Sequence, residues 1–184
     1  MRVGVTGAHR TGKTSLVEAV ASELPTYEVI DEPYRLLEDD GHELADPPSR
    51  EDFELQLRVS IELLGRDSKH VLFDRTPVDF VAYLHAGDHG DDGDLGVDLD
   101  DIRDAMAGLD LVVFVPIEDP DRVVVSASED RRLRRRVDQR LRQLVVDDML
   151  ELGVDTLEVN GDLATRVRQV VRAIAAADAR PTRR

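Results

Sequence analysis

The feature that most constrains this chain is a glycine-rich loop near its start, between an apolar run and a segment with helical spacing. Its residues match the pattern G-x-x-x-x-G-K-[ST] and are Gly7, Ala8, His9, Arg10, Thr11, Gly12, Lys13 and Thr14. Residues 2–6 before it form a short β-branched run, and residues 14–24 after it have apolar side chains at helical spacing. The segment therefore predicts a strand, a tight loop and a helix in succession.

This pattern in this setting is typical of a phosphate-binding loop (P-loop). Glycines let the backbone turn its N–H groups toward phosphate oxygens, and the helix N-terminus adds a partial positive charge. The side chain of Lys13 is expected to reach the β- and γ-phosphates, and the hydroxyl of Thr14 to bind Mg²⁺. We therefore predict that residues 7–14, with Ser15, bind ATP together with Mg²⁺, and GTP stays open as the nucleotide.

Composition and charge exclude several kinds of partner. The sequence has 39 acidic and 24 basic side chains, for a net charge of −15. This charge repels nucleic-acid backbones and anionic membranes, so we expect no long nucleic acid and no membrane as partner. Cysteine is absent, no run reaches the ~18 apolar residues of a membrane span, and the chain starts directly on an apolar strand. We expect one cytoplasmic domain over residues 1–178 and a disordered tail over 179–184.

Apolar runs and helical periodicity alternate along the rest of the chain. Further strands are predicted over residues 28–31, 70–73, 109–117 and 156–159, and helices over 49–66, 77–85, 129–152 and 162–177. The run over 109–117 is the strongest strand, which favours a place near the centre of a parallel sheet. Residues 87–101 are rich in glycine and aspartate and are interpreted as a solvated loop without a metal. The alternation predicts the three-layer α/β fold of P-loop NTPases, with about five parallel strands and helices on both faces.

Missing motifs exclude two large classes of P-loop protein. A Ras-type GTPase needs Asn-Lys-x-Asp for guanine and Asp-x-x-Gly after its third strand, and neither pattern occurs in the sequence. An AAA+ motor needs a much longer chain with a helical lid domain. Small-molecule kinases of the nucleoside and nucleotide kind are compact single domains of this length, and three further segments favour them.

The first of these segments follows the second predicted strand and contains Glu32 and Arg35. The carboxyl ends of the strands line the ligand crevice of a parallel α/β sheet, so this carboxylate is expected to face the acceptor. Glu32 is the candidate base that takes the proton of an attacking hydroxyl, and Arg35 is a candidate to bind an acceptor or transferred phosphate. A surface ion pair near a helix start is the alternative interpretation.

The second segment, Asp74-Arg75-Thr76, ends the third predicted strand. P-loop proteins usually have an acid at this place that holds Mg²⁺, so Asp74 is a candidate metal residue and Arg75 is expected to point toward the phosphates. A capped turn at the strand end is the alternative.

The third segment is the arginine-rich stretch over residues 129–136, after the strongest strand. Nucleotide kinases have a mobile, arginine-bearing lid at this point in the chain, and Arg131 and Arg135 are our candidates for it. A solvated helix face is the alternative for most of these arginines.

In this order the segments resemble two related groups, the deoxyribonucleoside kinases and the AAA-type P-loop kinases that include the nicotinamide riboside kinase domain. Glu32-Pro33 is similar to the Glu-Pro pair with the base of the first group, and Asp74-Arg75-Thr76 to its acidic-Arg-Ser triplet. Glu32-x-x-Arg35 resembles the E-x-x-R of the second group. The resemblance also implies that Asn160 lies in the loop beside the adenine. The Trp that follows Glu-Pro in deoxynucleoside kinases, and an aromatic set for holding a base, are not found.

The combined prediction is a Mg²⁺-dependent phosphotransferase that moves a phosphate from ATP to a small hydroxylated acceptor, a nucleoside or nucleotide-like metabolite. In this hypothesis Thr14 and Asp74 hold Mg²⁺, Glu32 is the base, and arginines neutralise charge. The alternative is a regulatory module that binds ATP or GTP and hydrolyses it slowly. A homodimer stays open, since many such kinases pair beside the acceptor site.

Overall fold

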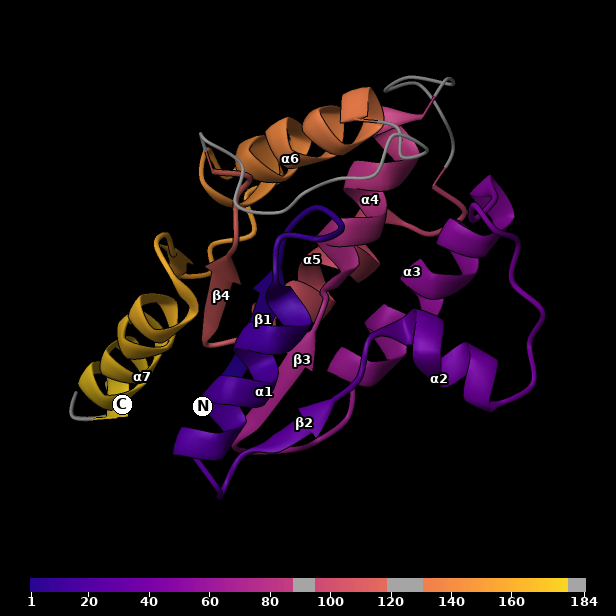
Figure 1. Cartoon of the computed structure of the whole chain (residues 1–184). Helices are drawn as coiled ribbons and strands as arrows, with labels where there is room; N and C mark the ends of the chain where they lie inside the picture. Colours follow the sequence, from indigo (N-terminus) through magenta and orange to yellow (C-terminus); the bar gives the residue numbers. More distant parts are fainter. Residues whose placement is uncertain (88–94, 119–130, 179–184) are drawn as a thin grey trace.

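The structure, a computed structural model, describes residues 1–87, 95–118 and 131–178 (Figure 1). The strands are β1 (Arg2–Thr6), β2 (Glu28–Ile30), β3 (Val71–Asp74), β4 (Leu111–Phe114) and β5 (Thr156–Glu158). The helices are α1 (Lys13–Glu23), α2 (Pro33–Asp39), α3 (Arg50–Leu64), α4 (Pro77–Ala86), α5 (Leu99–Ala107), α6 (Arg131–Val145) and α7 (Leu163–Asp178).

The strands form one parallel sheet in the order β2-β3-β1-β4-β5. The central strand β1 pairs with β3 on one side and β4 on the other, so that Gly4 lies opposite both Phe73 and Val112. The apolar run that we placed near the sheet centre becomes β4, directly beside the central strand. Because parallel strands end at a common edge, the segments that follow β1, β2 and β3 meet there. The predicted parallel α/β sheet is confirmed.

Helices cover both faces of the sheet, as predicted. Successive side chains of a strand point to opposite faces, so the strands divide their apolar residues between two cores. On one face, Val5 of β1 and Val113 of β4 pack with α1 and α7. On the other, Phe73 and Phe114 pack with α3, α4, α5 and α6. Figure 1 shows α7 beside α1 on one side of the sheet, with α6 crossing over the top of α4.

Two short helices were not predicted from the sequence. Helix α5 begins at Leu99, inside the segment that we interpreted as a solvated loop; residues 88–94 of that segment lie outside the described part. The side chain of Asp98 accepts the N–H of Asp100 and caps α5, while Ile102 and Met106 are buried on its inner face. Such a short apolar stripe in an acidic segment is a weak sequence signal for a helix, because the burial of the stripe depends on the neighbouring helices.

The second unpredicted helix, α2, begins with Pro33 at its first position, where a missing N–H costs nothing.

Helix α6 ends at Val145, earlier than the predicted 129–152. Residues 129–130 and the predicted tail over 179–184 lie outside the described part. None of the helices described is both long and apolar enough to cross a bilayer.

Candidate functional site

The glycine-rich loop connects the end of β1 to the start of α1, at the carboxyl edge of the sheet (Figure 1). Gly12 has a φ of 88°, a left-handed conformation that glycine adopts without strain. Gly7 is required for a different reason: a Cβ at this position would lie 2.5 Å from the carbonyl oxygen of Val115. Ser15 is exposed in the first turn of α1. Backbone conformation and close packing therefore explain the two glycines of the pattern.

Lys13 is buried beneath this loop, and its Nζ donates to the carbonyl of Ala8 at 2.7 Å. Burial and, less strongly, the charge of Arg75 lower the pKa of Lys13 to about 7, against the opposing effect of the carboxylates Asp79, Asp74 and Glu32. A phosphate beside Nζ would favour the charged form again. The lysine is thus placed, both in position and in charge, to respond to an anion in the loop.

Thr14 and Asp74 lie side by side, one at the start of α1 and the other at the end of β3. The hydroxyl of Thr14 donates to Oδ2 of Asp74 at 2.6 Å. Oδ1 of Asp74 is buried and has no hydrogen-bond partner within the part of the chain that the structure describes. Burial raises the pKa of Asp74, although the bond from Thr14 and the charges of Lys13 and Arg75 lower it.

This pair fits Mg²⁺, which takes one or two protein oxygens and completes its shell with water and substrate phosphates. The free carboxylate oxygen of Asp74 and the hydroxyl of Thr14 are oxygen ligands of the required kind. No group of three or more His, Asp or Glu side chains suited to a metal occurs among the described residues. The geometry therefore matches a metal shared with phosphates and not an all-protein metal cage.

Glu32 lies at the end of β2, directly before α2, and is held by arginines. Nε of Arg75 donates to its Oε2 at 2.9 Å, and Nε of Arg35 lies 3.8 Å from its Oε1. Burial alone would raise the pKa of Glu32, but Arg75 and, more weakly, Lys13 and Arg35 lower it below its usual range. The carboxylate is therefore ionised at neutral pH. Arg35 is 54% exposed and lies at the outer edge of this cluster.

Asp79 connects the glycine-rich loop with the segment after β3, although we did not single it out in the sequence. It is fully buried on α4, and its Oδ1 accepts from the N–H of Gly7 at 3.1 Å and from Nη1 of Arg75 at 3.3 Å. Its Oδ2 accepts the N–H of Thr76 at 2.9 Å. The spacing Thr76-x-x-Asp79 is that of a helix-capping box, a sequence signal that would have identified this residue.

Aromatic rings lie on the side of the loop next to Arg75. The hydroxyl of Tyr83 accepts the N–H of His9 at 2.9 Å, and Phe53 stacks on the Tyr83 ring at 4.8 Å between centroids. The guanidinium carbon of Arg75 lies 5.7 Å from the centre of the same ring. No aromatic set was recognised in the sequence, because these residues come from α3 and α4 and meet only in the folded chain.

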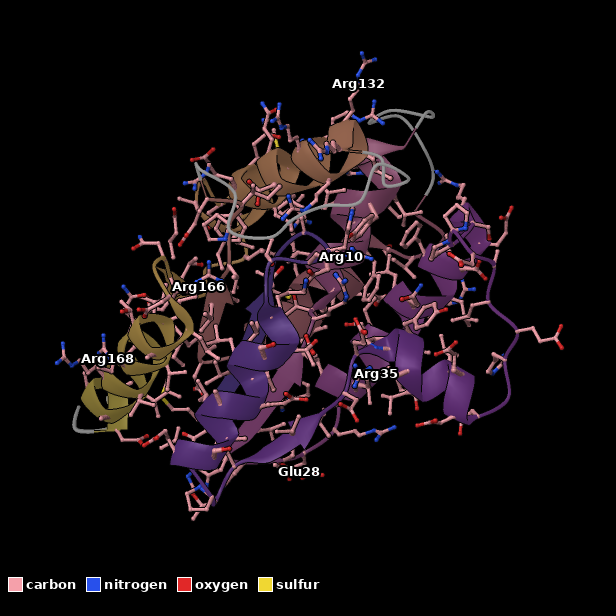
Figure 2. The ribbon with its side chains drawn as sticks, in the orientation of Figure 1. Arg10, Glu28, Arg35, Arg132, Arg166 and Arg168 are labelled. Carbon is pink, nitrogen blue, oxygen red and sulfur yellow. The ribbon has the colours of Figure 1, made fainter. Side chains whose placement is uncertain are left out.

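Two buried arginines contact the loop from α6 and α7. Arg134 donates to the carbonyls of His9 and Arg10, and Arg166 to that of Thr11. The predicted lid residues Arg131 and Arg135 are exposed on α6, on either side of Arg134 in sequence. Figure 2 shows Arg166 on the side of α7 that faces the loop, whereas Arg132 points outward from α6. In a run of arginines, only packing selects the one that is buried.

Asn160 is exposed in the segment after β5, and its N–H donates to Oε1 of Gln169 at 3.2 Å. The next residue, Gly161, donates its N–H to the carboxylate of Glu118. That carboxylate also pairs with Arg166, at 3.1 Å from Nη2. The segment that the family resemblance implies to lie beside the adenine is thus linked through two side chains, Glu118 and Arg166, to the glycine-rich loop.

A parallel sheet with such a loop after its central strand, and an aspartate at the end of the neighbouring strand, defines a P-loop protein. Within this class, the sequence model of the AAA domain family matches residues 2–166, and the chain belongs to this family. No curated protein matches the chain in sequence.

Solved structures share the fold over nearly the whole chain. Deoxyadenosine kinase from M. mycoides, with dCMP and dCDP bound, has a TM-score of 0.65 at 13% identity, over 96% of this chain and 100% of that one. NadR protein in complex with NAD and AMP-PNP has a TM-score of 0.63 at 19% identity, over 99% of this chain and 50% of NadR. Shikimate kinase from Acinetobacter baumannii, in complex with shikimate, has a TM-score of 0.52 at 18% identity, over 97% of this chain and 94% of that one.

These likenesses confirm the resemblance to P-loop kinases at the level of the fold. The chain spans about half the length of NadR, so the match concerns one part of that protein.

Proposed function

We propose that this protein is an ATP- and Mg²⁺-dependent phosphotransferase that phosphorylates a hydroxyl of a small acceptor, a nucleoside or nucleotide-like metabolite. The observation behind this proposal is the position of Glu32, an ionised carboxylate held by Arg75 beside a phosphate-binding lysine and the Thr14–Asp74 pair. A loop that only binds nucleotide needs no carboxylate across from it. A phosphotransferase needs one to receive the proton of the attacking hydroxyl.

In this reaction the loop amides and Lys13 hold the β- and γ-phosphates of ATP, and Thr14 and Asp74 hold the metal. Bound Mg²⁺ neutralises charge on the phosphates. The acceptor oxygen forms a bond to the γ-phosphorus while the bond from that phosphorus to the bridging oxygen of ADP breaks, and the hydroxyl proton passes to Glu32.

Arg75 stabilises the negative charge that spreads over the transferred group. Its guanidinium is anchored to Glu32 and Asp79 at the same time, so it is held beside both the acceptor and the loop. Positioning and charge stabilisation are the main contributions that a protein makes to phosphoryl transfer.

A flat, ring-containing acceptor is supported by two observations. Phe53 and Tyr83 form a stacked pair next to Arg75, and stacking on aromatic rings is a common way to hold a base. Among the similar structures, one is described as deoxyadenosine kinase and another as NadR protein in complex with NR. Shikimate kinase, in complex with shikimate, has the same fold, so the experiment below compares several acceptor classes.

The experiment supplies Mg·ATP with pooled nucleosides, nucleotides and ribosides, and follows phosphate gain by mass spectrometry. We expect one pool to gain a phosphate with the wild-type chain and not with Lys13→Ala. Replacing the base, Glu32→Gln, should leave ATP affinity within about two-fold and lower transfer roughly 100- to 1,000-fold. Glu28→Gln is the matched control, because Glu28 is exposed on β2, away from the loop (Figure 2).

Release of inorganic phosphate alone, with no product in any pool, would contradict the kinase and favour the regulatory module. A Glu32→Gln variant as active as Glu28→Gln would remove Glu32 from the mechanism.

A further inference from the structure

Two guanidinium groups from different helices bind the outer side of the glycine-rich loop. From α6, Nε of Arg134 donates to the carbonyl of His9 at 3.0 Å, and its Nη2 donates to the carbonyl of Arg10 at 3.2 Å. From α7, Nη1 of Arg166 donates to the carbonyl of Thr11 at 2.7 Å. The two arginines are only 4% and 8% exposed, so these bonds are shielded from water. Three successive carbonyls of the loop are therefore held in place.

The direction of these carbonyls also sets the direction of the amides that follow them. In a planar trans peptide, the C=O and the N–H point in opposite directions. When the carbonyls of residues 9–11 face the arginines, the N–H groups of residues 10–12 face away from them, toward the inside of the loop. Inward-facing amides of this kind bind phosphate oxygens.

We propose that Arg134 and Arg166, here called the arginine brace, are positioning residues that keep the loop amides directed at the phosphates before the nucleotide binds. Hydrogen bonds from a charged donor polarise the peptide, which strengthens its N–H as a donor on the opposite side. Amides that are already oriented lose less freedom on binding, so the affinity for phosphates rises. The inference rests on the nucleotide-binding part of the proposed function and does not require phosphate transfer.

Arg166 also links the loop to the segment after β5. Its Nη2 lies 3.1 Å from Oε1 of Glu118, whose carboxylate accepts the N–H of Gly161. Its Nε has no hydrogen-bond partner within the described ranges. The side chain is therefore held in position by the contacts of its two Nη groups with Thr11 and Glu118. Gly12 lies against the same guanidinium, since a Cβ there would be 3.6 Å from Nη1. The first turn of α7 is thus linked both to the phosphate side and to the predicted base side of the proposed nucleotide site.

The test compares the binding of two ligands, ATP and inorganic tripolyphosphate, each with Mg²⁺, by isothermal titration calorimetry. Arg134→Met and Arg166→Met remove the donors and keep most of the apolar stem. We expect each variant to bind both ligands roughly ten-fold more weakly, because a charged hydrogen bond to the loop is lost. Arg134→Lys should also lose affinity, since an ammonium lacks the fork that bonds two carbonyls. Arg168→Met is the control, because Arg168 is exposed on the same helix as Arg166 (Figure 2).

Several outcomes would overturn the brace. Weaker ATP binding with unchanged tripolyphosphate binding would assign the arginine to the nucleoside part of the ligand. Unchanged affinity for both ligands, or full affinity in Arg134→Lys, would show that the carbonyl bonds do not matter. Because no acceptor is present, none of these results depends on whether the protein transfers phosphate.

Hydrogen exchange separates loop orientation from general stability. Peptides that cover residues 7–14 should exchange faster in the Met variants without ligand, while β1 and β3 keep their protection. A uniform loss of protection over the whole chain would show a destabilised fold instead, and would overturn the positioning role.

Discussion

Burial and neighbouring charge act in opposite directions on single ionisable side chains of this site. Glu32 is partly buried and Asp74 is almost fully buried. Nevertheless, the pKa of Glu32 is lowered and that of Asp74 is raised. The difference is that Glu32 accepts a hydrogen bond from the charged guanidinium of Arg75, whereas Asp74 accepts one from the uncharged hydroxyl of Thr14. One carboxylate is thereby kept ionised, and the other gains most from a cation.

At the same scale, the lowered pKa of Lys13 predicts that the protein takes up a proton when it binds nucleotide. Its pKa lies at about 7 without a ligand, so part of the lysine is neutral at neutral pH. Phosphates favour the ammonium and raise this pKa, so binding adds a proton, and the affinity for ATP should fall as the pH rises above about 7. Calorimetry in two buffers with different heats of ionisation measures the uptake directly.

The control for this prediction is Lys13→Met, which should show weaker binding and no proton uptake from this site. A binding heat that is the same in both buffers would contradict a neutral fraction of Lys13.

At the scale of elements, α4 is the helix that joins the strand end of β3 to the glycine-rich loop. Its residue Asp79 accepts the backbone N–H groups of Gly7 and Thr76 and also pairs with Arg75. One carboxylate thus begins a helix, holds the loop and orients an arginine.

We expect Asp79→Asn to destabilise the chain by about 3 kcal/mol, because a buried amide replaces a charge-assisted acceptor and leaves Arg75 without this partner. The free energy of unfolding in urea measures the loss. Asp100→Asn is the control, since this residue is exposed at the start of α5 and its pair with Arg103 is solvated; its effect should stay below about 1 kcal/mol. Equal losses for both variants would contradict a special role of Asp79.

At the scale of the whole molecule, the proposed nucleotide site draws on elements from both faces of the sheet. Lys13 and Thr14 come from α1, Asp74 from β3, and the two arginines of the brace from α6 and α7. A ligand bound there contacts a site that exists only in the folded chain, so its binding energy adds to the free energy of unfolding.

Mg·ATP should therefore raise the unfolding temperature, with a gain of about 2.7 kcal/mol when free ligand reaches about 100 times its Kd. Removing Mg²⁺ with EDTA should reverse most of this gain in the wild type. In Asp74→Asn, EDTA should have little further effect, because one of the proposed metal residues is already lost. Thermal unfolding followed by circular dichroism gives all three comparisons, and a gain that EDTA leaves untouched would contradict the metal site.

Local patterns alone determined the framework of this protein. The glycine-rich loop, the strand before it and the helix after it depend on neighbouring residues, because left-handed φ at Gly12 and periodic apolar side chains are local properties. The alternation of strands and helices was enough to predict the parallel sheet. Glu32, Asp74 and Arg75 were recognisable because they directly follow predicted strands.

Only the tertiary structure decided which distant side chains meet at this loop. Arg134 is one of several arginines at similar spacing on α6, and its burial depends on how α6 packs over α4. The Phe53–Tyr83 stack likewise requires α3 and α4 to lie together. Contacts between residues far apart in the chain follow from packing geometry, which local propensity and periodicity do not contain.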